Sequence, residues 1–194
     1  YYKDVPLYEF SQEKAEAEMK KAWNGELWKK GFKMTITHNT GNALREAAAM
    51  MMAENIMALN PKFQIEVRNV AWKDYTVKYR QFAYPLFIIG WGADYPDPHN
   101  FLYTFMHSNG VYGKYAGFKD PEVDKLCDAG IKNVEPAKRN EVYGKLQDIW
   151  HEQAIGNTVY QKIEIKPYRE NVKGFVPNPM FSMVHEYLKN LYKE

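Results

Sequence analysis

Strand and helix patterns alternate along residues 33–91, and this alternation constrains the fold more than any other feature of the sequence. Residues 33–38 alternate between apolar and polar side chains, as a half-buried strand does. A helical pattern follows over residues 43–59, and a second alternating strand runs over residues 63–70. This order predicts two parallel strands joined by a right-handed crossover.

The same pattern continues with a predicted helix over residues 72–82 and a predicted strand over residues 86–91. The run Leu86-Phe87-Ile88-Ile89 is apolar without alternation, which is typical of a strand buried on both faces. We therefore expect an α/β domain in which helices cover a mainly parallel sheet. With 194 residues, the chain is long enough for one domain with a substantial core.

The residues that follow this third strand form the candidate binding site. In open α/β sheets, ligands bind beyond the carboxyl ends of the strands. Gly90 and Gly92 have no side chains, so their backbones can approach a ligand closely. Trp91 and Tyr95 offer apolar walls, and the carboxylate of Asp94 can receive a cation.

Two structural interpretations compete with a binding role in this stretch. Asp94 can be a turn residue that bonds its own backbone. Asp97 precedes Pro98, and this pair is typical of a helix start with an N-cap aspartate. Helices are also predicted to begin at Asp120-Pro121 and at Glu135-Pro136. In the latter helix, we interpret Lys138 and Arg139 as part of the solvated face.

Composition excludes several function classes. The net charge of +2 and the lack of a basic face argue against nucleic-acid binding. The one cysteine, Cys127, precludes an internal disulfide and is expected to be a buried small side chain. No apolar run approaches the length of a membrane span. Because the chain starts with Tyr1-Tyr2-Lys3-Asp4 and no signal peptide, we expect it to be a piece of a longer protein.

Motifs for covalent chemistry are missing from the sequence. There is no Gly-x-Ser-x-Gly, no phosphate-binding loop and no dinucleotide-binding glycine pattern. The five histidines form no His-x-x-x-His pair, so neither a metal site nor a cofactor is predicted. His99 with Asp94 and Asp97 is a loose set of metal-capable groups, and we interpret His99 as a surface residue beside a helix cap. A hydrolase that uses Asp94 and Asp97 as an acid/base pair is the remaining catalytic hypothesis.

One stretch, Trp91-Gly92-Ala93-Asp94-Tyr95-Pro96-Asp97-Pro98, resembles the signature in the C-terminal lobe of extracellular solute-binding proteins of the peptide/nickel type. These proteins are the receptors of oligopeptide and dipeptide ABC importers. The similarity runs from about Phe10 to about Gly174. It includes the following further segments: Asn60-Pro61-Lys62-Phe63, Asp120-Pro121-Glu122-Val123-Asp124-Lys125-Leu126, Lys138-Arg139, Thr158-Val159-Tyr160 and Val172-Lys173-Gly174.

This resemblance implies a two-lobed clamshell that binds a solute and catalyses no reaction. Residues 1–174 would form its second lobe, and residues 175–194 would return toward a first lobe that precedes this sequence. The implied partners are a peptide or another small solute, an ABC permease and that first lobe. The implied location is periplasmic or extracellular, with attachment to the membrane only through the permease or a lipid anchor outside this sequence.

The resemblance also implies roles for individual residues. In peptide-binding members, the aspartate at the position of Asp94 pairs with the α-amino group of the peptide, and the tryptophan at Trp91 lies beside the ligand. A tyrosine near Tyr160, in a strand predicted over residues 157–166, can also face the ligand. Some oligopeptide binders carry an arginine where this chain has Ile88, so a sugar or a nickel chelate stays open as an alternative solute.

Overall fold

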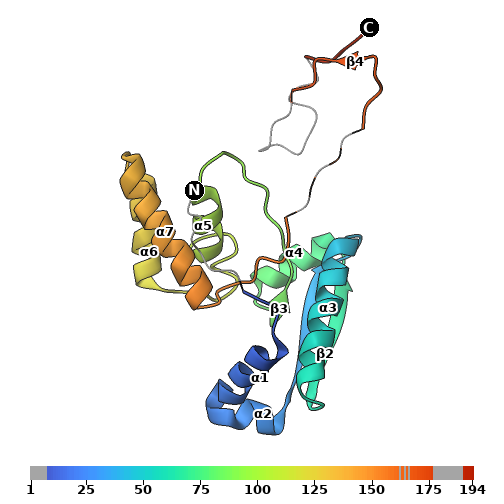
Figure 1. The fold of residues 1–194 in the computed structure, drawn as a ribbon, viewed down its shortest axis with the longest axis vertical. Helices are drawn as coiled ribbons and strands as arrows, with labels where there is room; N and C mark the ends of the chain where they lie inside the picture. The colour runs from blue at the N-terminus through green and yellow to red at the C-terminus, as the bar shows by residue number, and fades with distance from the viewer. Residues whose placement is uncertain (1–7, 162, 164, 166, 177–189) are drawn as a thin grey trace. The chain divides into compact units, whose positions relative to one another are not determined.

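The computed structural model describes residues 8–161, 163, 165, 167–176 and 190–194. These residues form two compact units (Figure 1). Residues 8–90 and 115–117 form the sheet unit, and residues 91–114 with the described residues from 118 onward form the helical unit. In the described residues, no helix combines the length and apolar character that a membrane crossing requires.

A parallel sheet is the centre of the sheet unit. Strand β1 (Phe32–Asn39) pairs in parallel with β2 (Phe63–Val70), with Phe32 opposite Phe63. Strand β3 (Leu86–Phe87) pairs in parallel with the other side of β1, which gives the strand order β2-β1-β3. The predicted α/β fold with a mainly parallel sheet is therefore confirmed.

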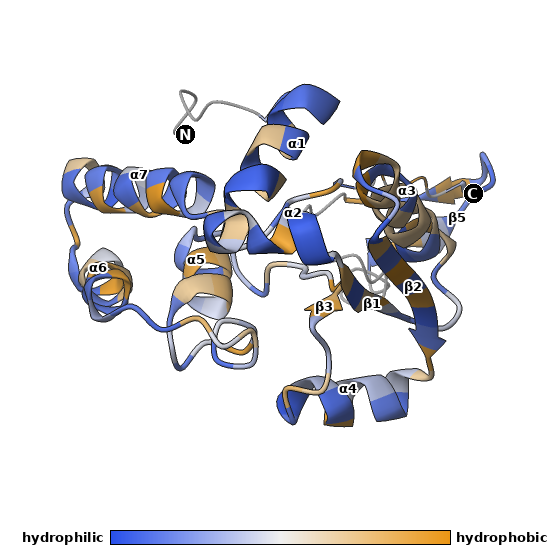
Figure 2. Cartoon of the chain, turned by 90° about the horizontal axis from the view of Figure 1, so that it is seen from below, coloured by the Kyte–Doolittle hydropathy of each residue, from blue (hydrophilic) through white to orange (hydrophobic). Residues whose placement is uncertain are grey.

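Helix α3 (Ala43–Leu59) is the crossover between β1 and β2, with the bounds that the sequence predicts. It packs on the sheet through three small residues, Ala48, Ala49 and Ala53, which join Ile36, Ile65 and Ile88 in one buried cluster. Figure 2 shows hydrophobic colour over much of α3. Leu44 and Met51 have the apolar spacing of core positions but are exposed, because the alanine side of the helix is the side that faces the core.

The third strand is shorter than predicted and lies at an edge of the sheet that the described residues form. Its two residues, Leu86 and Phe87, are only half-buried, so the expectation of a strand over residues 86–91 buried on both faces is wrong. Ile88 still donates its N–H to Thr37 O at 2.9 Å. Its carbonyl accepts a bond of 2.9 Å from the hydroxyl of Tyr75 in α4 (Trp72–Arg80).

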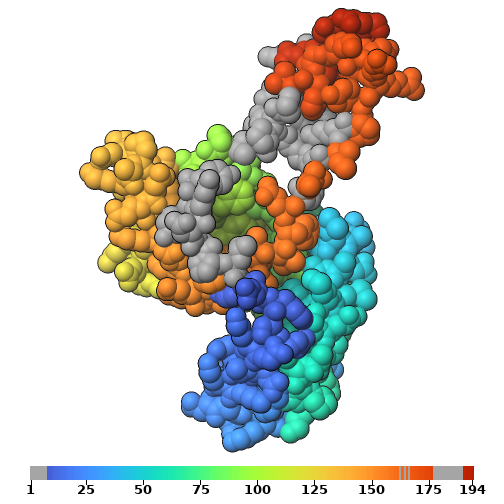
Figure 3. All heavy atoms as spheres, in the orientation of Figure 1, coloured from blue at the N-terminus to red at the C-terminus, as the bar shows by residue number. Residues whose placement is uncertain are grey.

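Two N-terminal helices, α1 (Gln12–Lys21) and α2 (Glu26–Lys30), flank the 3₁₀ turn η1 (Ala22–Gly25) and belong to the same unit. Gln12 Nε2 donates to Asn55 Oδ1 of α3 at 3.1 Å, and Figure 3 shows this blue segment against the cyan α3–β2 region. Gly31 ends α2 with a φ of +73°. A Cβ at Gly31 would lie 2.4 Å from the carbonyl oxygen of Lys62, so glycine is required where α2 meets the turn before β2.

Three helices share the buried core of the helical unit. These are α5 (His99–Met106), α6 (Pro121–Lys132) and α7 (Pro136–Glu152), and their buried cluster is Met106, Val123, Cys127, Tyr143 and Leu146. Asp120 caps α6 as predicted, by accepting the N–H of Glu122 at 2.8 Å. Burial raises the pKa of the Cys127 thiol to about 12, which fits its expected role as a packing residue. Strands β4 (Val172–Lys173) and β5 (Tyr192–Lys193) pair antiparallel.

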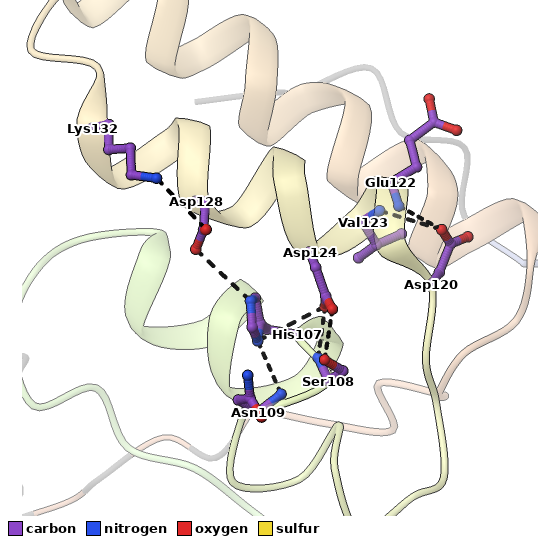
Figure 4. A network of polar contacts seen from close by, with 9 residues as sticks. All are labelled: His107, Ser108, Asn109, Asp120, Glu122, Val123, Asp124, Asp128 and Lys132. Carbon is purple, nitrogen blue, oxygen red and sulfur yellow. Dashed lines mark hydrogen bonds and ion pairs between the residues drawn. The ribbon is translucent and has the colours of Figure 1, made fainter.

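A polar network joins the end of α5 to α6 (Figure 4). Ser108 donates to the Asp124 carboxylate with both its N–H, at 2.7 Å, and its hydroxyl, at 2.6 Å. Burial raises the pKa of Asp124, but the two bonds from Ser108 outweigh it, so the pKa lies below its usual 3.8. The buried ring of His107 accepts the N–H of Asn109 at Nδ1 (2.9 Å), and each of its nitrogens lies 3.8 Å from an aspartate, Asp124 or Asp128.

An ion pair joins α7 to the segment before α5. Nη2 of Arg139 lies 2.7 Å from both carboxylate oxygens of Asp97, and Nε donates to Gly130 O at 3.0 Å. Arg139 is therefore an anchor, and its assignment to the solvated face of α7 is wrong. Asp97 also accepts the N–H of His99 at 2.9 Å, but α5 begins at His99 and its N-cap is Pro98, so the predicted helix start with Asp97 as N-cap lies one residue too early. Burial raises the pKa of Asp97, but these hydrogen bonds and the Arg139 charge lower it overall.

Replacing Gly31 by alanine should destabilise the protein strongly. Gly41 is a matched control, because it has a similar φ of +79° but no atom within 4 Å of the position that a Cβ would take. Gly41→Ala should cost only the strain of positive φ, about 1–2 kcal/mol. Gly31→Ala should cost about 1–3 kcal/mol more, from the contact with Lys62. Urea unfolding of both variants measures the difference, and equal losses would contradict the crowding at Gly31.

Acidification should destabilise the helical unit in two steps. Burial lowers the pKa of His99 below 6.5, so the unfolded chain takes up this proton first and stability falls as the pH drops below 6.5. Asp97 and Asp124 have pKa values lowered from 3.8, so their contribution is present above pH 3.8 and is lost below it. Thermal melts from pH 8 to pH 3 measure both steps.

Variants assign each step of this pH profile. His99→Gln should lack the step below pH 6.5 and retain the acidic one. Asp124→Asn should weaken only the acidic step. A first step of unchanged size in His99→Gln would show that another group carries it.

Candidate functional site

The loop of residues 91–98 has no helix or strand, and Asn100 of α5 holds its two most distinctive side chains. The Asn100 Oδ1 atom accepts the indole N–H of Trp91 at 2.7 Å and the backbone N–H of Asp94 at 3.2 Å. Its Nδ2 atom donates to the Asp94 carboxylate at 3.4 Å. The structure therefore brings Trp91 and Asp94 together through one side chain, which is itself only 7% exposed.

Trp91 forms a half-buried wall with aromatic support behind it. Its ring meets the ring of Tyr112 edge-on, with centroids 5.7 Å apart and an interplanar angle of 89°. Tyr112 in turn contacts Phe105 at 5.0 Å. Because Tyr112 is buried, the indole is held on one side by packing and at Nε1 by a hydrogen bond.

The two carboxylates of the loop have different environments. Asp97 is neutralised by Arg139, and the side chains of the pair are only 24% and 26% exposed. Asp94 is exposed, and in the described part of the chain its carboxylate receives one amide donor and forms no ion pair. A carboxylate of this kind can receive a cation from solution, whereas Asp97 cannot do so without losing Arg139.

The other predicted site residues do not take part in the hydrogen bonds that join Trp91, Asn100 and Asp94 in the described structure. Gly92 is exposed, with nothing within 4 Å of a Cβ position, and Tyr95 is exposed in the same loop. Tyr160 is exposed too, but the described residues 157–161, 163 and 165 form no strand, so the strand predicted there is wrong. Among described residues, no hydrogen bond or ring contact joins Tyr160 to the loop.

Gly90 belongs to the sheet unit, and its missing side chain makes room for an arginine. A Cβ on Gly90 would lie 2.8 Å from Nη2 of Arg45 in the first turn of α3. The Nη1 atom of Arg45 donates to Asn39 Oδ1 at the end of β1, at 2.6 Å. The close approach that the sequence predicted for a ligand at Gly90 is thus made here by the Arg45 guanidinium.

Two residues central to this loop were missed from the sequence, Asn100 and Arg139. Asn100 stands inside a helical segment and matches no motif, and Arg139 pairs with a carboxylate 42 positions away. No local spacing marks either contact. Within the described ranges, no group of three metal-ligating side chains comes together, although His99 Nδ1 is buried without a hydrogen-bond partner there.

Comparison with known proteins bears on this loop directly. The family model of bacterial extracellular solute-binding proteins, family 5 middle region, matches residues 1–113, which include the loop. The dipeptide-binding protein of Escherichia coli is 27% identical over 190 residues, covering 93% of this chain and 34% of that protein. Heme-binding protein A of Haemophilus influenzae is 31% identical over 131 residues, covering 66% of this chain and 24% of that protein.

Solved structures show the same fold. The periplasmic binding protein DppA of Helicobacter pylori, in complex with the peptide STSA, superimposes with a TM-score of 0.82 at 21% identity, over 100% of this chain and 36% of that one. This chain thus spans about a third of the length of such relatives. The family match over more than half of the chain, with the signature loop inside it, shows that this protein belongs to the bacterial extracellular solute-binding proteins of family 5.

Proposed function

We propose that the protein containing this chain captures a peptide for an ABC importer, with Asp94 pairing the α-amino group of the peptide. The observation that carries this proposal is the contrast between the two loop carboxylates. Asp97 is held by Arg139, whereas Asp94 is exposed, fixed by Asn100 and without a cationic partner among the described residues. An ammonium against such a carboxylate makes a charge-assisted hydrogen bond, which is stronger than a neutral one.

Other parts of the loop fit the same role. Trp91 and Tyr95 would offer apolar surface to the peptide, and Gly92 leaves the backbone accessible. We propose Tyr160, from the family resemblance, and Gly90, through its backbone, as further contacts, although the space of the missing Gly90 side chain itself is taken by Arg45. The relatives named as dipeptide-binding and oligopeptide-binding proteins support a peptide as the solute.

The proposal extends to the whole protein. Residues 1–174 would form the second lobe of a clamshell, residues 175–194 would return toward the first lobe, and closure of the lobes would exclude water from the ion pair. The closed protein would deliver its solute to the permease in the periplasm or at the cell surface. A sugar stacked on Trp91 or a nickel chelate is the alternative solute on the same scaffold.

Hydrolysis by Asp94 and Asp97 is a poorer fit to the geometry. An acid/base pair needs two carboxylates that exchange protons at neutral pH. The pKa of Asp97 is lowered by its bonds to Arg139 and to the His99 N–H, against the opposing effect of burial. Asp97 therefore stays ionised and bound to its guanidinium.

Asp94→Asn should retain the fold and weaken peptide binding. Asparagine has nearly the same shape and still accepts the Asn100 bond, so the variant removes only the charge. Loss of one partner of a buried, hydrogen-bonded charge pair costs about 2–5 kcal/mol, or roughly a thirtyfold to several-thousandfold loss of affinity. Titration calorimetry of the full-length protein with alanine peptides of two to five residues measures this loss.

Glu141→Gln is the matched control for Asp94→Asn. It removes one negative charge from an exposed pair with Lys145 on α7 and should leave affinity within about twofold. N-acetylation of the peptide should reproduce the Asp94→Asn loss and add little to it. Equal binding of free and acetylated peptides would refute amine capture by Asp94, and binding of glycosides or nickel chelates alone would favour the alternative solutes.

A further inference from the structure

We propose that Asn100 is the positioning residue of the binding loop, which sets the pose of both Trp91 and Asp94 without touching the solute. This inference rests on the proposed role of Asp94 in amine capture. Its structural basis is that three hydrogen bonds from two loop residues converge on one buried amide. With 7% of its surface exposed, Asn100 has little area to offer a ligand.

Asn100 belongs to a regular helix, whereas the loop that it contacts has few backbone hydrogen bonds of its own among the described residues. Asn100 lies in the first turn of α5, and the far end of α5 is held to α6 by the bonds from Ser108 to Asp124 at 2.7 and 2.6 Å. Residues 91–98 have no regular structure, and their described internal backbone bond joins Asp97 N to Tyr95 O. The amide on α5 therefore transfers the rigidity of the helix to Trp91 and Asp94.

The hydrogen-bond acceptors and donors of an amide suit the positioning of Trp91 and Asp94. The Oδ1 atom has two lone pairs, and the Trp91 indole N–H and the Asp94 backbone N–H use both. The Nδ2 atom supplies a donor to the Asp94 carboxylate without neutralising its charge. An aspartate at this position would retain the acceptor and place a second negative charge beside Asp94, and an alanine would leave two N–H groups without their partner.

Positioning of this kind affects affinity through preorganisation. A carboxylate and an indole that already lie in their binding pose lose less conformational freedom when the solute arrives. Without Asn100, the loop would have to be ordered during binding. The cost should therefore appear for solutes that use Asp94 and should be small for solutes that do not.

A double-mutant cycle on the full-length protein tests this inference. The proteins are wild type, Asn100→Ala, Asp94→Asn and the double variant, and the probes are the peptide Ala-Ala-Ala and its N-acetyl form. Asn100→Ala should weaken binding of the free peptide about tenfold or more. In the Asp94→Asn background, and for the acetylated peptide, the same change should cost less than about threefold, which is the coupling that a shared interaction produces.

Thr104→Val is the matched control for general damage to α5. Thr104 is as buried as Asn100 and lies one turn further along α5, and valine has its shape but lacks the hydroxyl that bonds Asn100 O. Because this bond goes to backbone, the loop contacts of the Asn100 side chain stay in place. Thr104→Val should lower thermal stability and leave the affinity for Ala-Ala-Ala unchanged.

Asn100→Asp decides the question if Asn100→Ala does not fold. It retains the acceptor for Trp91, so the fluorescence assigned to this residue by comparison with Trp91→Phe should be preserved. The new carboxylate would lie beside that of Asp94, whose Oδ2 is now 3.4 Å from Asn100 Nδ2, and like charges raise carboxyl pKa values. Asp94 should therefore be protonated at a higher pH, so Ala-Ala-Ala should be released at a higher pH on acidification. An unchanged release pH would show that the side chain at position 100 does not lie beside the Asp94 carboxylate, which removes the contact on which the positioning role rests.

The outcomes separate this inference from the proposed function. Wild type that binds free and acetylated peptide alike overturns amine capture and the role of Asn100 with it. Wild type that prefers the free peptide, with Asn100→Ala losing affinity equally in both Asp94 backgrounds, overturns only the role of Asn100. An unchanged release pH in Asn100→Asp also overturns it, and coupling together with a raised release pH supports it.

Discussion

The ion pair between Arg139 and Asp97 determines which carboxylate in the loop of residues 91–98 stays available to a cation from solution. It joins α7 to the last turn before α5 and saturates one of the two carboxylates in that segment. The same guanidinium bonds Gly130 O of α6 and the hydroxyl of Tyr143, so one side chain contacts three parts of the helical unit. A loop that begins and ends at fixed points can expose a charged residue between them and still hold its shape.

This arrangement separates an ion-paired carboxylate from an exposed, unpaired one within four residues of the described loop. Asp97 accepts two bonds from Arg139 and one from the His99 N–H, so its oxygens are committed to the fold. Asp94 accepts one long bond from a neutral amide and retains its charge for another partner. The network at Ser108 and Asp124 is a second structural use of a carboxylate, and it fixes the opposite end of α5. Anchored at both ends, α5 is a rigid base for Asn100.

The parts of the fold that the sequence predicted well are those with local causes. Period-two alternation located β1 and β2, and the helical pattern over residues 43–59 located α3. The predictions were wrong where contacts between residues far apart in the sequence decide which side chains are buried and where a strand ends. Leu44 and Met51 look like core residues in a helical pattern, but the alanines of α3 are what face the sheet. Likewise, the run over residues 86–91 has strand composition, yet its pairing with β1 covers only Leu86 and Phe87, and the Ile88 carbonyl bonds the Tyr75 hydroxyl.

The candidate site follows the same rule. Composition and order were enough to single out Trp91 and Asp94, because they follow the third predicted strand, and open α/β sheets bind ligands beyond the carboxyl ends of their strands. The sequence could not reveal the side chains that hold them, since Asn100 and Arg139 act through geometry and not through spacing. Gly90 illustrates the same limit, because a missing side chain predicts that something approaches but not that it is Arg45. In this protein the candidate groups of the loop, Trp91 and Asp94, can be picked out from the sequence, and the groups that orient them require the folded chain.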